Sequence, residues 1–165
     1  MNPKIKNVVL LIVQSLVTAL TFIPGFYSKA IWVEHREYLE YLDVVVTPQE
    51  KTSDRAFSFL GAIFDFDINS LTKIIGVLAA AVILGCFIYT LMQFVKKAPD
   101  NVALSFGMFF VEFASLLLYS SAIKLNSADY ESFSLEYSAG PICWIMLALA
   151  VTTFVVALKK HPAER

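Results

Sequence analysis

The stretch over residues 102–123 constrains the fold of this chain more than any other. It is a long apolar run, and a helix that rises about 1.5 Å per residue over this length crosses the hydrocarbon core of a bilayer. One acid, Glu112, lies near its middle. A carboxyl group at that depth costs roughly 2.5 kcal/mol or more and usually faces protein or a water-filled cavity. The run therefore predicts a membrane-spanning helix whose acid points away from lipid.

Three more apolar runs indicate a multi-pass membrane protein. The chain is 58% hydrophobic and 16% charged, whereas soluble domains average about 45–50% apolar and 25% charged. The predicted helices cover residues 8–26, 71–95, 102–123 and 141–158, and they form a single domain over residues 1–165. Residues 17–19 also loosely fit a signal-peptide cleavage site. The run continues past that site to Ile23, which favours a retained helix.

The charges predict how the helices are oriented. One side of the predicted bundle carries two acids, Asp100 and Glu164, and seven basic residues: Lys4, Lys6, Lys96, Lys97, Lys159, Lys160 and Arg165. The loops over residues 27–70 and 124–140 hold most of the acids. Short basic loops stay in the cytoplasm. We therefore expect an integral protein of the plasma (cytoplasmic) membrane, with both termini cytoplasmic and both long loops outside.

Alternating apolar and polar residues predict strands in both outer loops. This pattern occurs at residues 57–59, 64–69 and 133–137, and it is typical of half-buried strands. Residues 32–42 also allow a short amphipathic helix. The predicted fold class is an all-α membrane protein, a four-transmembrane-helix bundle with a small extracytoplasmic β-containing cap.

This layout of helices, loops and outer strands resembles the claudin and peripheral-myelin-protein type of tetraspan. The resemblance lies in topology and in no signature motif. The first outer loop contains Trp32 but lacks the cysteine pair of claudins. The chain is also similar to small bacterial four-helix membrane proteins of unknown function. That similarity lies at residues 22–27, where an apolar-Pro-aromatic segment ends the first helix, and at residues 140–144, where Gly and Trp begin the last. It implies no activity.

Helical spacing selects the residues that can join Glu112 inside the membrane. Gln14 and Thr18 lie at a similar depth on the first helix, and Ser115 shares a face with Glu112. We therefore expect an intramembrane polar cluster of Glu112, Gln14, Thr18 and Ser115. Three interpretations are open: a protonated acid that joins helices, a contact with another subunit, and a proton or cation relay. A relay normally needs further titratable groups, and the predicted spans hold no second acid, His or Lys at mid-depth.

The sequence contains no pattern typical of an enzyme. It has no phosphate loop, no nucleophile–base motif and no paired metal ligands. Its two cysteines, Cys86 and Cys143, lie at different predicted depths, so we expect them to pack rather than to form a disulfide. His35 with its neighbouring acids fits a solvated face better than a metal site. We expect no catalytic residues, no cofactor, no metal and no nucleic-acid partner.

The outer loops are acidic and rich in aromatic residues, which are favoured in protein interfaces. Trp32, Tyr38 and Tyr41 are candidates for such contacts. Trp32, Phe26 and Trp144 also fit an interfacial aromatic belt. We expect a non-enzymatic accessory, scaffolding or assembly subunit whose partners are membrane lipids and another membrane protein or further copies of itself. The alternative is a small oligomeric transporter or channel subunit that uses Glu112 as a proton or cation site.

Overall fold

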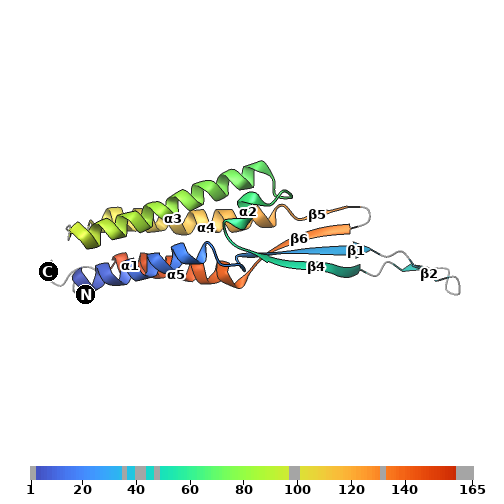
Figure 1. Ribbon diagram of the computed structural model, residues 1–165, viewed down its shortest axis with the longest axis horizontal. Coiled ribbons are helices and arrows are strands. Elements are labelled where there is room, and N and C mark those ends of the chain that lie inside the picture. The colour runs from blue at the N-terminus through green and yellow to red at the C-terminus, as the bar shows by residue number, and fades with distance from the viewer. Residues whose placement is uncertain are drawn as a thin grey trace.

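A computed structural model shows a mostly helical chain with a small open sheet at one end (Figure 1). It describes residues 3–34, 37–39, 44–46, 49–96, 101–130 and 133–158. The four long helices are α1 (Pro3–Leu20), α3 (Ser70–Lys96), α4 (Val102–Lys124) and α5 (Pro141–Leu158). Three of them, α3, α4 and α5, are long and apolar enough to cross a membrane. This is consistent with a membrane protein.

The four helices form a bundle in which sequence neighbours are antiparallel. Helix α1 packs against α3 and α5, and α4 packs against the same two. Helices α1 and α4 therefore lie across the diagonal of the bundle, and both run toward the sheet (Figure 1). We call this the sheet end, and the opposite end the far end. Because α1 and α4 run in the same direction, side chains that point from them into the centre of the bundle can meet where their depths are similar.

Helix α1 ends at Leu20, before the predicted end near residue 26. Pro24 disfavours helical backbone in the residue before it, and Gly25 has a φ of 108°, which favours glycine. The chain leaves the helix through i→i+3 bonds, such as the 3.2 Å bond from the Ile23 amide to the Leu20 carbonyl. The helix also begins earlier than predicted, at Pro3.

A four-stranded antiparallel sheet joins the two long loops. Its strands β1 (Tyr27–Glu34), β4 (Gln49–Phe57), β5 (Ala128–Asp129) and β6 (Phe133–Ala139) are arranged in the order β4-β1-β6-β5. Strands β2 (Glu37–Leu39) and β3 (Val44–Val46) form a separate pair. The expectation that strands from both loops share one sheet is met, and β6 contains the predicted alternation at residues 133–137.

Three local predictions in the first long loop were wrong. The alternation at residues 57–59 is not a strand, because β4 ends at Phe57 and the chain turns at Phe59 before α2. Residues 64–69 form no strand, because the short helix α2 (Gly61–Phe64) and a turn at Asp65 replace it. The Asp65 carboxylate accepts a 3.1 Å bond from the Asp67 amide, which is typical of an Asx turn. The alternative helix over residues 32–42 is also absent from the described part of that segment, where β1 and β2 lie.

The sheet meets the bundle at a backbone crossing around Gly25 and Gly140. The Gly25 amide donates to the Phe57 carbonyl at 3.0 Å, and the Gly140 amide donates to the Phe26 carbonyl at 2.9 Å. The Ile142 amide then donates to the Gly25 carbonyl at 3.0 Å. A Cβ on Gly140 would lie only 2.1 Å from the Gly25 oxygen, so only glycine allows this approach. These bonds link β1, β4 and the start of α5.

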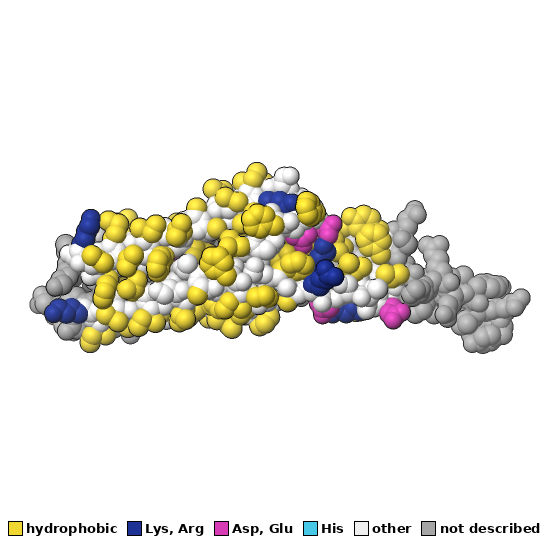
Figure 2. Space-filling model, viewed as in Figure 1, with side chains coloured by type: hydrophobic (Ala, Val, Ile, Leu, Met, Phe, Trp, Pro, Cys, Tyr) yellow, Lys and Arg dark blue, Asp and Glu magenta, His cyan; other side chains and the backbone are white. Residues whose placement is uncertain are grey.

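On the face drawn in Figure 2, the bundle is largely hydrophobic between its two ends. Basic side chains gather at the far end, and acidic and basic side chains gather where the bundle meets the sheet. Large apolar side chains are exposed around the sheet end. Those with the greatest exposed fractions are Phe22, Phe64, Phe66, Leu71, Leu125 and Trp144. This distribution is typical of a protein whose bundle lies in lipid.

Candidate functional site

The centre of the bundle holds a hydrogen bond between Gln14 and Glu112. The Gln14 Nε2 group donates to Glu112 Oε2 at 2.6 Å, and both side chains are 0% exposed. The bond joins α1 to α4 across the diagonal of the bundle. The acid therefore faces the interior of its own bundle and not the outer surface of the bundle.

The pair has more acceptors than donors. Gln14 Oε1 and Glu112 Oε1 are both buried, and neither has a hydrogen-bond partner among the described residues. A protonated carboxyl group supplies one donor, whereas an ionised one supplies none. An ionised carboxylate held by a single hydrogen bond in an apolar interior is costly. The geometry therefore favours a neutral pair.

Thr18 and Ser115 do not bind the carboxyl group. The Thr18 hydroxyl donates to the Gln14 carbonyl at 2.9 Å, and the Ser115 hydroxyl donates to the Glu112 carbonyl at 2.8 Å. Each hydroxyl thus satisfies a carbonyl of its own helix, as Ser and Thr commonly do in helices. Of the four residues predicted for the cluster, the structure joins two through their side chains.

Hydrophobic clusters lie on both sides of the Gln14–Glu112 pair. Toward the sheet end, Val17, Ile83, Leu116 and Ala150 belong to the larger one. The smaller cluster, toward the far end, consists of buried Leu10, Cys86, Phe109 and Ala157. On α4, Glu112 falls between Phe109 and Leu116, so the polar pair separates two apolar layers of the core.

A second polar layer lies at the far end of the bundle. Gln93 Nε2 donates to the Tyr89 hydroxyl at 2.6 Å, and that hydroxyl lies 2.9 Å from Ser105 Oγ. Lys6 is buried, and its Nζ donates to the Ala157 carbonyl at 2.9 Å. A cation there stabilises the last carbonyls of α5. From the sequence, Lys6 is only an orientation signal, because nothing there places it against α5.

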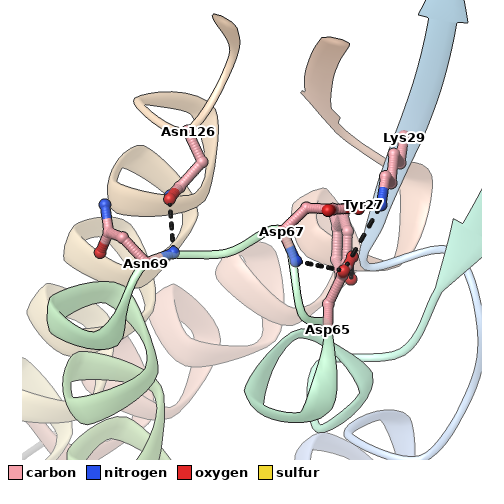
Figure 3. A network of polar contacts seen from close by, with 6 residues as sticks. All are labelled: Tyr27, Lys29, Asp65, Asp67, Asn69 and Asn126. Carbon is pink, nitrogen blue, oxygen red and sulfur yellow. Dashed lines mark hydrogen bonds and ion pairs between the residues drawn. The ribbon is translucent and has the colours of Figure 1, made fainter.

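A polar network at the sheet end of the bundle joins the sheet to the segment between α2 and α3 (Figure 3). The Tyr27 hydroxyl donates to Asp65 at 3.2 Å, and Lys29 contacts both Asp65 and Asp67. The Asn69 amide donates to Asn126 Oδ1 at 2.8 Å, which links the start of α3 to the end of α4 (Figure 3). The sequence does not predict this network, because the alternation at residues 64–69 places Asp65 and Asp67 on the solvent face of a strand.

Two tyrosines of the sheet are held in their neutral form. Burial raises the pKa of Tyr27, and the nearby Asp65 carboxylate raises it further. Burial also raises the pKa of Tyr137, again with smaller contributions from Asp65 and Asp67. Both phenols therefore stay protonated well above neutral pH, which argues against acid–base chemistry by either group near neutral pH.

The contact residues predicted outside the membrane are not brought into one site. Trp32 is half-buried on β1, where its Nε1 donates to Glu136 at 3.1 Å and Lys51 Nζ lies 5.8 Å from its ring centroid. Tyr38 belongs to β2, while Tyr41 and His35 lie outside the described residues. The belt prediction was wrong for Phe26, which is buried against Phe59 and Tyr119.

An apolar groove of about 420 Å³ lies between α3 and α4 on the outer surface of the bundle. It is lined by Val82, Gly85, Cys86, Ala103, Leu104, Gly107, Met108 and Val111. A Cβ added at Gly85 or Gly107 would meet no atom within 4 Å, so both glycines leave open space. Ala103 and Gly107 are four residues apart, the spacing at which small residues let membrane helices approach closely.

No protein-family model and no characterised protein matches this chain. Within the described ranges, Cys86 and Cys143 are free and buried, and no three potential metal ligands come together. The observations that bear on function are therefore the buried pair, the groove and the polar surface of the sheet.

Proposed function

We propose that this chain is a non-enzymatic accessory, scaffolding or assembly subunit of the plasma membrane that binds another membrane protein. In this proposal all four long helices span the membrane, both termini are cytoplasmic and the sheet lies outside. The inclusion of α1 is supported by Gln14, which bonds to the middle of α4. The groove between α3 and α4 carries the proposal of a partner.

The groove suits a partner helix because small residues line its floor. Gly85 and Gly107 leave their backbones open to the outside of the bundle. Helices associate in lipid through close packing, because lipid tails are as apolar as leucine and provide no hydrophobic driving force. Open glycines on two adjacent helices allow a third helix to approach more closely than it can elsewhere on an apolar surface.

The position of Glu112 supports a structural role for this acid within the subunit. Its carboxyl group is fully buried and bonded to Gln14 of the same chain. A contact with an intramembrane residue of another subunit would require the side chain to leave that bond. We therefore assign the acid to holding α1 and α4 together, and the lateral contact to the groove.

The transporter alternative rests on the two unpaired acceptors at the bundle centre, Gln14 Oε1 and Glu112 Oε1. These atoms could receive a proton or a cation. The hydrophobic clusters on both sides of the pair argue against this alternative, because they keep water from the acid. A bundle of four helices would also need further copies to enclose a pathway.

The test compares two leucine substitutions of the same kind. The protein is purified gently from the membrane in which it is naturally made, as wild type, Gly107→Leu and Ala148→Leu. Gly107→Leu fills the groove, while Ala148→Leu adds bulk at an exposed position of α5 that does not line it. We expect a different chain to co-purify in fixed stoichiometry with wild type and Ala148→Leu, and to be lost from Gly107→Leu.

A wild-type protein that purifies with no second chain would refute the accessory role. In that case, reconstitution into vesicles distinguishes the alternative. Proton flux that is present in wild type and lost in Glu112→Gln would support transport. A partner retained equally by both leucine variants would keep the accessory role but place the contact outside the groove.

A further inference from the structure

A second pocket, distinct from the α3–α4 groove, lies between α4 and α5 where β6 meets the bundle. Its volume is about 320 Å³. It is lined by Leu117, Ser120, Ser121, Lys124, Ser138, Ala139, Cys143, Trp144 and Leu147. Pockets of this size accommodate small ligands or ligand headgroups.

The lining changes from polar to apolar along the bundle axis. Lys124 and Ser121 belong to the last turns of α4, and Ser138 lies at the end of β6, so these three residues mark the sheet end. Leu117 and Leu147 lie further into the bundle, on two helices that are long and apolar enough to cross a membrane. A ligand that fits this gradient has a polar head and an apolar body.

The polar part of the pocket offers donors and a positive charge. Lys124 forms no ion pair with a carboxylate in the described part of the chain, and no acid lines the pocket. Trp144 is 63% exposed, and neither its indole N–H nor the Ser121 hydroxyl bonds to any residue that the structure describes. Unpaired N–H and O–H groups beside a lysine complement an anionic oxygen, as in a phosphate.

We propose that this pocket binds the headgroup of an anionic phospholipid. The phosphate contacts Lys124 and Ser121, and the first part of an acyl chain lies along Leu117 and Leu147. A phospholipid fits better than a soluble anion because the apolar wall belongs to membrane-spanning helices. A lysine at the membrane surface attracts anionic lipid, and tryptophan is favoured at this depth.

Trp144 provides a reporter inside the proposed site. Trp32→Phe leaves Trp144 as the single tryptophan, because the chain contains two. This variant is reconstituted into phosphatidylcholine vesicles that contain either dibrominated phosphatidylglycerol or dibrominated phosphatidylcholine at the same mole fraction. Bromine quenches tryptophan only at short range, so the extra quenching by the anionic lipid measures its preference for the pocket.

We expect the anionic lipid to be preferred about fivefold, the effect of one lysine near the surface. Lys124→Gln should reduce this preference to near unity. The matched control is Lys73→Gln, which removes a lysine at the same end of the bundle that does not line the pocket. Equal quenching by both lipids in the Trp32→Phe protein would overturn the proposal, as would a preference that survives Lys124→Gln or is lost in Lys73→Gln. Quenching by dibrominated phosphatidylcholine in every variant verifies membrane insertion.

Discussion

Replacing Glu112 and Gln14 singly and together tests whether their bond holds the bundle together. The informative variants are Glu112→Gln, Glu112→Leu, Gln14→Leu and the double leucine variant. Because the two side chains meet across the bundle diagonal at 2.6 Å, each single leucine substitution leaves the other polar group buried without its partner. The double substitution removes both groups and replaces them with apolar side chains of similar size.

The structure predicts different costs for these variants. Glu112→Leu leaves the Gln14 amide without its acceptor, and an unsatisfied buried polar group costs about 1–3 kcal/mol. Glu112→Gln retains a carbonyl acceptor in the same place, so we expect a loss below about 1 kcal/mol if the acid is neutral. The double leucine variant should lie near wild type, because removing both partners of a buried hydrogen bond can be nearly neutral. The coupling energy should then approach the sum of the two single losses, about 2 kcal/mol or more, which is above the average for hydrogen bonds between membrane helices.

The measurement is unfolding of the purified protein by sodium dodecyl sulfate in mixed micelles, followed by circular dichroism. The four free energies of unfolding form a double-mutant cycle. Additive losses in Glu112→Leu and Gln14→Leu would refute the assignment of the pair as a link between α1 and α4. A loss in Glu112→Gln as large as that in Glu112→Leu would refute a neutral acid that a carboxamide can replace.

Two further predictions concern packing and pH. Gly76→Ala places a Cβ 2.6 Å from ring atoms of buried Tyr119, so it should destabilise the bundle by about 2 kcal/mol. Gly85→Ala is the control, because its Cβ meets nothing within 4 Å; equal effects on the unfolding free energy would contradict this packing. The raised pKa of Tyr27, caused mainly by burial and then by Asp65, means that the unfolded chain loses this proton first. Stability should therefore fall as pH rises above about 10, and Tyr27→Phe should weaken that fall in an alkaline titration followed by tryptophan fluorescence. An alkaline titration that is the same for Tyr27→Phe and wild type would contradict this role of Tyr27.

Much of the helical framework follows from hydrophobic length alone. The bounds of α3, α4 and α5 lie within two residues of the predicted runs, because long apolar segments flanked by charges and turn residues have few alternatives. The contact between Gln14 and Glu112 also follows from the sequence, because the two residues lie at similar depths on helices that run in the same direction. Whether α1 spans the membrane is part of the proposal, because the three helices that meet the length and composition criteria are α3, α4 and α5.

The polar contacts between distant segments could not be read from the sequence. Thr18 and Ser115 have the right spacing for the cluster, but each hydroxyl donates to a backbone carbonyl of its own helix instead. The alternation at residues 64–69 is typical of a strand, yet the Asx turn at Asp65 gives the backbone another partner. Local periodicity does not distinguish these outcomes, because the deciding partners are nearby backbone groups or distant side chains such as Lys29.

The backbone crossing at Gly25 and Gly140 has a mechanical consequence. Strand β6 ends at Ala139 and α5 begins at Pro141, so Gly140 alone separates sheet from helix. The bonds from Gly140 to Phe26 and from Ile142 to Gly25 tie this junction to the base of β1. This short, hydrogen-bonded junction therefore allows the sheet little motion that is independent of α5. A force applied to its strands is delivered as torque to the sheet end of α5, which packs against both α1 and α4.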